Sequence, residues 1–355
     1  MNPVPELLAA AATGTPWIIA ELSANHDGSL QRALATIDAI AATGAQTVKF
    51  QTYTAESMTL DSDRPAFRVT DDHGLWGGRR LFDLYREAGT PYEWHEALFA
   101  RAREHGLVPF SSPFDASAVE LLEGLGCAVY KIASAELLDL PLIRLAAGTG
   151  KPLVISTGMA SLGDIDAALS AARSAGSGQL VLLSCTAAYP AAPAQSHLAN
   201  IAVLREAFGV PVGLSDHTPG VGVPVAAVAL GAVAVEKHVM LDRDGGGVDS
   251  AFSLDQVELA DLVRECTAAG AAVAAPPAFG IRPGEEETAR FRRSLWVARD
   301  VAAGETVQPG TVRSLRPAGG LPPGSWEDVV GRPFARSVPG GTPLTWDLLD
   351  APVSR

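Results

Sequence analysis

The chain has 355 residues, of which 27 are Lys or Arg and 40 are Asp or Glu, so its formal net charge is −13. This acidic balance argues against nucleic acid or an anionic membrane surface as the main partner, because both need a basic face on the protein. A content of 47% hydrophobic and 19% charged residues is typical of a folded chain and excludes a disordered one. At this length we expect one large domain followed by a small one.

The three cysteines, Cys127, Cys185 and Cys266, have neither metal-ligand spacing nor redox-motif spacing. We therefore expect no disulfide scaffold and a cytoplasmic location, where thiols stay reduced. The first 17 residues lack the basic start and long apolar core of a secretory signal peptide. A run of about 18 uninterrupted apolar residues, which would predict a membrane span, does not occur in the sequence.

Short apolar runs alternate with Ala- and Leu-rich amphipathic stretches between residues 17 and 239. There are eight runs: WIIAEL (17–22), TVKFQT (47–52), LVPFSS (107–112), VYKIAS (129–134), PLVIST (152–157), LVLLSC (180–185), PVGLSDH (211–217) and AVAVEKHV (232–239). The stretches between them, such as SLQRALATIDAIAATG, end near a glycine, as helices commonly do. Strand-helix units of this number over roughly 260 residues match a (β/α)8 barrel, which we assign to residues 1–275.

A doubly wound open sheet is the competing fold, because it also gives alternating strands and helices. The two folds differ in where polar residues fall. Nearly every apolar run ends in a polar side chain. A closed barrel collects such groups from the carboxyl ends of all eight strands, whereas an open sheet collects only those near one switch point. The pattern therefore favours the barrel.

The composition changes after residue 270, where AAVAAPPAFGIRPGEEE is rich in Pro, Gly and Glu. We interpret residues 276–290 as a linker. Residues 291–355 carry short β-type runs broken by Gly and Pro turns, which predicts a small, mostly β domain. A domain of this size has a modest core, so we expect it to dock onto the barrel or onto a partner chain.

Two histidines end the seventh and eighth runs, in SDHTPG and EKHV. Adjacent strand ends would bring His217 and His238 close together, beside Asp216 and Glu236. Such a pair suits a divalent metal with coordination positions open for substrate or water. The alternative is that each imidazole caps its own strand by bonding to the backbone, and the residues alone leave both interpretations open.

Two lysines, Lys49 and Lys131, lie near the ends of the second and fourth runs. A lysine in a barrel lumen is costly unless an anion partners it, so we expect a phosphate or carboxylate ligand there. The alternative is an internal ion pair with Glu21, Glu136 or Glu236. Neutral donors to the same anion would come from serines at strand ends: Ser112, Ser134, Ser156 and Ser215.

Glu21 ends the first run and precedes the turn-rich segment SANHDGS. Its carboxylate can accept a hydrogen bond from a substrate hydroxyl or act as an acid or base, and a salt bridge to Lys49 is the plain alternative. The glycine-rich segment at 245–249 is typical of a loop at the rim, from which Asp249 can reach a ligand. Trp76 and Tyr85 lie in an insertion after the second strand, where they either pack the loop or contact a ligand.

The sequence also carries, in this order, IIAELSANHDGSLQRA, VKFQTY, FSSPFD, YKIASAE, ISTGMAS, SCTAAYP, GLSDHTPG, EKHV and DSAFSL. This ordered set resembles the motifs of the sialic acid synthase family. The residues from FRRSLWVARDVAAGE onward resemble the antifreeze-like (SAF) domain of that family. The resemblance covers the chain from about residue 15 and implies an α/β TIM barrel followed by a small, mostly β SAF domain of the β-clip type. One departure is Ala187 in SCTAAYP, where relatives carry Asn or Ser.

Within this family, the insertion at 74–95 and the stretch GGGVDSAFSL are similar to those of pseudaminic acid synthases. The resemblance implies a metal-dependent condensation of phosphoenolpyruvate with 2,4-diacetamido-2,4,6-trideoxy-L-altrose, which gives pseudaminic acid and phosphate. N-acetylneuraminate and legionaminate synthases share the motifs and stay as alternatives. A sugar-binding homologue without turnover would be expected to lose some of the characteristic residues, and the sequence keeps all of these: Glu21, Lys49, Lys131, His217 and His238.

The resemblance also implies roles for single residues. His217 and His238 fall on the positions of metal ligands, usually for manganese, with magnesium or cobalt as alternatives. We expect four catalytic residues: Glu21, Lys49, Lys131 and Glu236. Substrate contacts are implied at Gln51, Ser112, Ser134, Glu136, Ser156, Tyr189, Ser215 and Asp249. Arg316 matches an arginine that reaches the sugar's acetamido group in the partner's barrel, which implies a domain-swapped homodimer.

Overall fold

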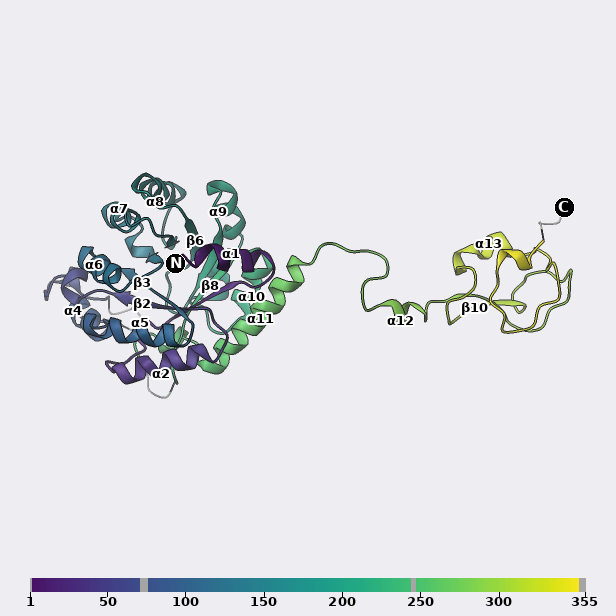
Figure 1. Cartoon of the computed structure of the whole chain (residues 1–355), viewed down its shortest axis with the longest axis horizontal. Helices are drawn as coiled ribbons and strands as arrows, with labels where there is room; N and C mark the ends of the chain where they lie inside the picture. The colour runs from purple at the N-terminus through teal and green to yellow at the C-terminus, as the bar shows by residue number, and fades with distance from the viewer. Residues whose placement is uncertain (1, 71–75, 244–246, 351–355) are drawn as a thin grey trace. The chain divides into compact units, whose positions relative to one another are not determined.

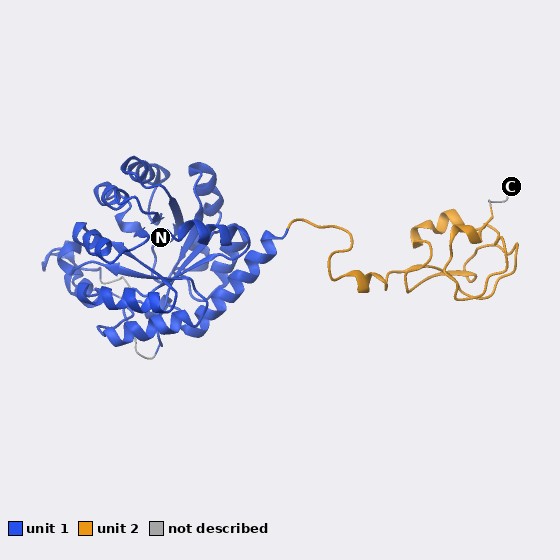
Figure 2. Cartoon of the chain, in the orientation of Figure 1, with its two compact units in different colours: residues 1–275 blue, residues 276–355 orange. Residues whose placement is uncertain are grey.

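The computed structural model describes residues 2–70, 76–243 and 247–350. Contacts between Cα atoms divide the chain into two compact units, Met1–Ala275 and Pro276–Arg355 (Figure 2). Each unit has its own apolar core and is described by itself.

The first unit is a closed barrel of parallel strands that pair in sequence order. The eight strands found among the described residues are β1 (Trp17–Glu21), β2 (Thr47–Thr52), β3 (Val108–Pro113), β4 (Tyr130–Ile132), β5 (Leu153–Ser156), β6 (Leu180–Cys185), β7 (Val212–Asp216) and β8 (Ala234–His238). Strand β8 closes on β1, which places His238 opposite Glu21. The closed barrel confirms the prediction from the eight apolar runs and excludes the open sheet.

Helices cover the outside of this barrel (Figure 1). They are α1 (Val4–Ala12), α2 (Leu30–Ala41), α5 (His95–Glu104), α6 (Ala116–Gly124), α7 (Leu140–Ala147), α8 (Leu162–Ala175), α9 (Asn200–Phe208), α10 (Gly222–Ala229) and α11 (Gln256–Ala274). Several begin at a Ser or Asp whose side chain accepts a hydrogen bond from a backbone N–H of the first turn, a favourable N-cap: Ser29, Asp115, Asp139, Ser161 and Asp255. The insertion between β2 and α5 adds α3 (Ala55–Met58) and α4 (Leu81–Ala88).

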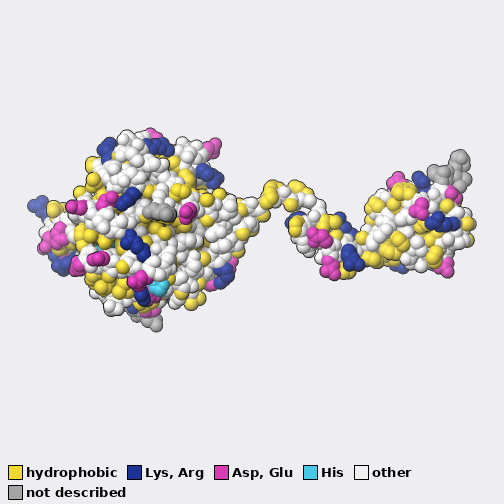
Figure 3. Space-filling model, in the orientation of Figure 1, with side chains coloured by type: hydrophobic (Ala, Val, Ile, Leu, Met, Phe, Trp, Pro, Cys, Tyr) yellow, Lys and Arg dark blue, Asp and Glu magenta, His cyan; other side chains and the backbone are white. Residues whose placement is uncertain are grey.

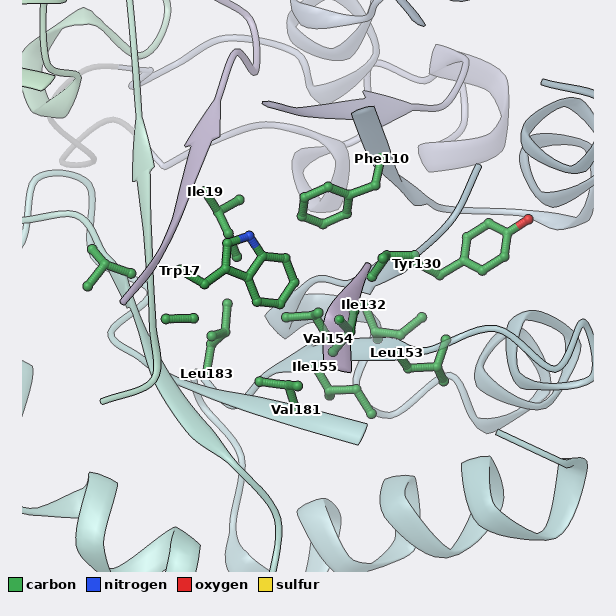
Figure 4. Close-up of a cluster of buried hydrophobic side chains, with 14 of the residues drawn as sticks. Trp17, Ile19, Phe110, Tyr130, Ile132, Leu153, Val154, Ile155, Val181 and Leu183 are labelled. Atoms are coloured by element: carbon green, nitrogen blue, oxygen red, sulfur yellow. The ribbon is translucent and has the colours of Figure 1, made fainter. Parts of the chain in front are cut away.

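Large apolar side chains fill the barrel below its carboxyl end (Figure 4). Trp17, the first residue of β1, is buried with its ring centroid 6.0 Å from that of Phe110. Its indole Nε1 donates to Thr47 Oγ1 at 3.0 Å, so the buried polar atom is satisfied. Because this end of the lumen is packed with apolar groups, the polar strand ends are left to line the opposite end.

The second unit is small and mostly irregular, with a two-stranded antiparallel sheet of β9 (Ser294–Val297) and β10 (Val312–Leu315). Two single-turn helices, α12 (Glu286–Ala289) and α13 (Trp326–Val329), accompany the sheet. Its core consists of Leu295, Val297, Val301, Val307, Val312, Val329, Phe334, Val338, Leu344, Leu348 and Leu349. Helix α12 lies inside the segment predicted as a linker, residues 276–290, whose limits stay a prediction.

The surface of the first unit carries charges of both signs. On the face visible in Figure 3, Lys and Arg side chains are interspersed with Asp and Glu. Across the described ranges, no helix is long and apolar enough to cross a membrane.

Candidate active site

A cavity of about 390 Å³ opens at the carboxyl ends of the barrel strands. It gathers residues that lie far apart in the sequence, from the ends of β2, β4, β5, β6, β7 and β8. The predicted site residues that line it are Lys49, Gln51, Lys131, Ser134, Ser156, Tyr189, Ser215, His217, Glu236, His238 and Asp249. Polar groups from six strand ends therefore share one space, as in the catalytic face of a (β/α)8 barrel.

Four other predicted residues do not line this cavity. Glu21 is fully buried behind it and connects to it through Lys49 and Gln51. Ser112 Oγ and Glu136 Oε2 are buried, and neither atom has a hydrogen-bond partner among the described residues. Arg316 belongs to the second unit, where it lines a separate surface groove.

Two buried lysines that line the cavity are paired with two buried carboxylates, of which Glu236 lines the cavity and Glu21 lies behind it. Lys49 Nζ lies 2.5 Å from Glu21 Oε2 and 3.5 Å from Glu236 Oε2. Lys131 Nζ lies 3.8 Å from Glu236 Oε1 and donates to Ser156 Oγ at 2.6 Å. The internal ion pairs with Glu21 and Glu236 that the sequence left as an alternative are thus present. They hold both ammonium groups at the cavity.

Burial and pairing act in opposite directions on the two lysines. Burial lowers the pKa of Lys49, but the carboxylates of Glu21 and Glu236 outweigh it, so the net pKa shift is upward. Burial lowers the pKa of Lys131, and the attraction of Glu236 is too weak to reverse this, so the net pKa shift is downward. Burial also raises the pKa of Glu236, yet Lys131 and Lys49 reverse this and hold it well below its usual range. Glu236 therefore stays ionised between two lysines.

A series of hydrogen bonds runs from Glu21 to Asp249, which lies beside His238. Gln51 Nε2 donates to Glu21 Oε1 at 3.1 Å and to Ser23 Oγ at 3.0 Å. Ser23 Oγ in turn donates to Asp249 Oδ2 at 2.6 Å, and that carboxylate oxygen lies 3.4 Å from His238 Nδ1. Ser23 was not predicted from the sequence, because it lies beyond the end of β1, where the backbone leaves the strand conformation.

The two histidines at the ends of β7 and β8 meet with their ring centroids 5.3 Å apart. His217 Nδ1 lies 2.9 Å from the carbonyl oxygen of Thr186, an arrangement in which Nδ1 donates and Nε2 keeps a free lone pair. Burial lowers the pKa of His217 to about 3, helped by the neighbouring His238, so its imidazole is neutral. His238 Nδ1 is buried and has no hydrogen-bond partner in the described part of the chain.

Neutral imidazoles with available lone pairs are good ligands for a divalent transition metal. The alternative, in which each imidazole bonds to the backbone, is present only at Nδ1 of His217. It leaves Nε2 of that residue free to bind a metal. No group of three or more His, Cys, Asp or Glu side chains is placed to hold an ion within the described ranges. The two imidazoles at adjacent strand ends fit a metal whose remaining positions substrate or water would complete.

The backbone at Gly158 lies close to the side chain of Ser134, which lines the cavity. The backbone N–H of Gly158 donates to Ser134 Oγ at 3.0 Å. A Cβ at position 158 would lie 2.7 Å from that oxygen, closer than real Cβ contacts come. Glycine in the segment ISTGMAS therefore lets the backbone N–H reach Ser134 Oγ, and a larger residue would displace that hydroxyl.

Apolar and aromatic side chains also line the cavity. The Tyr189 ring lies 4.3 Å from the His217 ring and 5.9 Å from that of Trp76, centroid to centroid. Trp76 Nε1 donates to the carbonyl oxygen of Val248 at 3.1 Å. Trp76 and Tyr85, for which loop packing was the alternative, both line the cavity. Residues 71–75 and 244–246, in the two loops from which these groups come, lie outside the described residues.

The comparisons with known proteins agree with the resemblance found in the sequence. The pseudaminic acid synthase of Helicobacter pylori is 40% identical over 336 residues, which cover 94% of this chain and 98% of that protein. The N,N'-diacetyllegionaminic acid synthase of Legionella pneumophila is 31% identical over 344 residues, 95% of each chain. The crystal structure of N-acetylneuraminic acid synthetase from Leptospira borgpetersenii, 30% identical, superposes with a TM-score of 0.68 over 78% of this chain and 90% of that chain.

Two family models match the chain in the expected order. The NeuB family model matches residues 36–276, and the SAF domain model matches residues 292–350. These matches confirm both the barrel with its predicted family and the antifreeze-like domain after it. The chain belongs to the NeuB family of sugar-acid synthases and carries a SAF domain at its C-terminal end.

Proposed function

We propose that this protein is a pseudaminic acid synthase. It condenses phosphoenolpyruvate with 2,4-diacetamido-2,4,6-trideoxy-L-altrose and releases phosphate, a transferase reaction that forms a C–C bond. The likeness to the Helicobacter pylori pseudaminic acid synthase supports this choice of substrates. The observation that carries the proposal is the cavity in which two buried lysines and two buried histidines line one space.

The lysine side of the cavity is the proposed site of phosphoenolpyruvate. Lys49 and Lys131 supply positive charge, and the hydroxyls of Ser134, Ser156 and Ser215 supply neutral donors. Water is largely excluded there, since the two lysines are 4% and 1% exposed. Charge-charge attraction is stronger in such a site than in water, so it favours a small polyanion.

His217 and His238 are the proposed ligands of a divalent metal, with manganese the first choice and magnesium or cobalt as alternatives. When bound, the ion supplies Lewis acidity at the aldehyde oxygen of the open-chain sugar. Tyr189, against the His217 ring, and Asp249, beside His238, flank the same position. The histidines therefore orient the sugar aldehyde toward the phosphoenolpyruvate held by the lysines.

The reaction then follows from these positions. C3 of phosphoenolpyruvate attacks the aldehyde carbon, and water adds to C2. The resulting tetrahedral intermediate releases phosphate. Glu236 lines the cavity between the lysines and holds both ammonium groups toward the phosphoenolpyruvate. The proton lost by that water goes to the alkoxide that the attack leaves on the aldehyde oxygen. Glu21 engages Lys49 with one oxygen and Gln51 with the other, which supports a positioning role.

The active form is proposed to be a twofold, domain-swapped dimer in which Arg316 contacts the sugar's acetamido group in the partner's barrel. Exposed apolar side chains before the SAF core support docking, because large exposed apolar groups commonly mark contact surfaces. Phe279 is 97% exposed, Ile281 51% and Phe291 57%. A cytoplasmic location belongs to the same proposal, supported by free thiols at Cys127, Cys185 and Cys266.

Legionaminate and N-acetylneuraminate synthases are the competing assignments, since relatives with those names share the family. A sugar-binding protein without turnover is disfavoured, because its cavity would not need to assemble both lysines and both histidines. The sugar is therefore the point to test.

The proposed reaction is tested by incubating the protein with phosphoenolpyruvate, Mn²⁺ and each of three sugars in turn. These are the diacetamido altrose sugar, its stereoisomer used for legionaminic acid, and N-acetylmannosamine. Phosphate should appear with the altrose sugar in equal amounts with a nine-carbon acid. Lys131→Met should abolish phosphate release without unfolding the protein. Phosphate release with another sugar alone would reassign the substrate, and none with any sugar would refute the function.

A further inference from the structure

Several apolar and aromatic side chains line the cavity together with the polar ones. We call this group the apolar wall, formed by Tyr53, Trp76, Leu81, Leu84, Tyr85 and Val248. Most of these residues come from the insertion between β2 and α5. The catalytic assignments above make no use of them.

Helix α4 provides the centre of the apolar wall. Its cavity-lining residues are Leu81, Leu84, Tyr85 and Ala88, which have the spacing i, i+3, i+4 and i+7. This spacing defines one face of a helix. An amphipathic helix normally turns that face to a protein core, whereas α4 presents it to the cavity.

The apolar wall is held in place by contacts outside the cavity. The Tyr53 ring meets the Tyr85 ring edge-on at 5.9 Å. Arg80, which precedes α4, forms ion pairs with Asp61 and Asp63 of the preceding loop. Helix α4 therefore has contacts on two sides that hold it in position, one with the residue after β2 and one with the loop before the helix.

Tyr189 connects the histidines to the apolar wall. Its ring centroid lies 4.3 Å from that of His217 and 5.9 Å from that of Trp76. An extended chain of six carbons spans about 6 Å from C1 to C6, since each bond is about 1.5 Å. A sugar with its aldehyde at the histidines thus extends past Tyr189 toward the apolar wall.

A hydroxyl group placed against Leu81 and Leu84 would lose its hydrogen bonds to water without gaining new ones, because neither side chain has a donor or acceptor. A 6-deoxy diacetamido sugar instead offers methyl groups, one at C6 and one on each acetamido group. We propose that the face of α4 formed by Leu81 and Leu84 receives the C6 methyl group and makes the enzyme select 6-deoxy sugars. This inference rests on the proposed function, because it assumes that the sugar aldehyde binds at the histidines.

The test compares kcat/KM for the 6-deoxy altrose sugar with kcat/KM for its 6-hydroxy counterpart, 2,4-diacetamido-2,4-dideoxy-L-altrose. The wild-type protein should favour the 6-deoxy sugar by roughly 10- to 100-fold, the usual range for a hydrophobic pocket. Leu81→Asn and Leu84→Asn should each lower this ratio about tenfold. The KM for phosphoenolpyruvate should stay within about twofold, because the lysine side is untouched.

Two control variants distinguish a loss of the apolar wall from the effects of any substitution in the protein. Leu81→Met keeps an apolar side chain at the wall, and Leu145→Asn makes the same change on α7, where Leu145 is exposed and does not line the cavity. Both should keep the wild-type ratio. Leu81→Ala, which adds no polar group, should still lower the ratio severalfold if the asparagine variants fail to fold.

The outcomes distinguish the inference from the function on which it rests. If the wild-type protein turns over the 6-deoxy sugar but folded Leu81→Asn, Leu84→Asn and Leu81→Ala keep its ratio, the wall does not select the methyl group. The same conclusion follows if the wild-type protein accepts both sugars equally. If the wild-type protein releases no phosphate with either sugar, the proposed function itself fails, and the inference fails with it.

Discussion

Glu21 and Lys49 lie directly opposite each other on β1 and β2, joined by a 2.5 Å ion pair between two buried side chains. Removing one partner of such a pair leaves a buried charge unpaired, which typically costs about 3–5 kcal/mol. The pair lies behind the cavity and presents the Lys49 ammonium to it. A variant in which both residues are changed separates the effect of the pair on stability from its effect on activity.

Lys49→Met and Glu21→Gln should each abolish turnover, and Lys49→Met should lower the free energy of unfolding by about 3–5 kcal/mol because Glu21 is left unpaired. The double variant should recover most of the stability, since no unpaired charge remains, but none of the activity. Urea unfolding and phosphate release measure the two properties separately. An active double variant would show that Lys49 has no part in binding phosphoenolpyruvate.

Metal removal should stop turnover reversibly, because two imidazoles from adjacent strand ends make an open, exchangeable site. Treatment with a chelator should abolish phosphate release, and added Mn²⁺ should restore it. His217→Ala should bind less manganese and lose activity while its thermal unfolding stays close to that of the wild-type protein. Full activity of metal-free protein, checked by elemental analysis, would contradict the assignment.

Gly158→Ala should raise the KM for phosphoenolpyruvate by roughly 10- to 100-fold. The new Cβ would displace Ser134 Oγ and remove one donor to the anion, and a hydrogen bond to a charged group is worth about 1.5–3 kcal/mol. Gly163→Ala is the matched control, since its Cβ would make only an ordinary contact with Ser161 Oγ at 3.7 Å. Equal KM values in the two variants would mean that Ser134 does not contact phosphoenolpyruvate.

Stability should fall as the pH drops below about 6.5, partly through His95. Burial lowers the pKa of this histidine, whose ring nitrogens lie 2.8 Å from Thr52 Oγ1 and 3.1 Å from the Pro91 carbonyl oxygen. The unfolded chain therefore takes up the proton first, so acid favours unfolding. The loss is at most about 1.4 kcal/mol per pH unit for one group. In urea unfolding between pH 7.5 and 5.5, His95→Gln should show a shallower decrease, and an unchanged slope would exclude His95 as the cause.

A shared active site predicts complementation between two inactive variants. Glu21→Gln and Arg316→Ala homodimers should both be nearly inactive. Unfolding and refolding them together makes about half the dimers mixed, and each mixed dimer has one intact site of two. The mixture should regain roughly a quarter of the wild-type activity. If the SAF domain serves its own barrel, every site keeps one defect and the mixture stays inactive.

The sequence predicted the barrel because the strand period and the polar strand ends are local patterns. Lys131, Ser156 and His238 each end an apolar run, and parallel strands bring such ends together. It was harder to predict which of these strand-end side chains line the cavity. Ser112 follows the same pattern yet does not line the cavity, because alternation indicates a face of the strand but not the space above it.

The missed residues depend on tertiary contacts. Ser23 enters the site because its backbone turns there with φ of 48°, an uncommon conformation for serine that no local pattern in SANHDGS reveals. Leu81 and Leu84 have an ordinary helical spacing, which predicts an apolar face but not what that face covers. In the structure it covers a cavity, and this relationship could not be predicted from the helix alone.

The central claim, condensation of phosphoenolpyruvate with a 6-deoxy diacetamido sugar, is tested most directly by competition in one reaction. The protein receives phosphoenolpyruvate, Mn²⁺ and equal concentrations of the altrose sugar and N-acetylmannosamine, and the acids formed are separated by mass. Pseudaminic acid should exceed N-acetylneuraminic acid by about 100-fold or more, since the two sugars differ both in a methyl group and in an acetamido group. N-acetylneuraminic acid as the main product, or comparable amounts of both acids, would contradict the account.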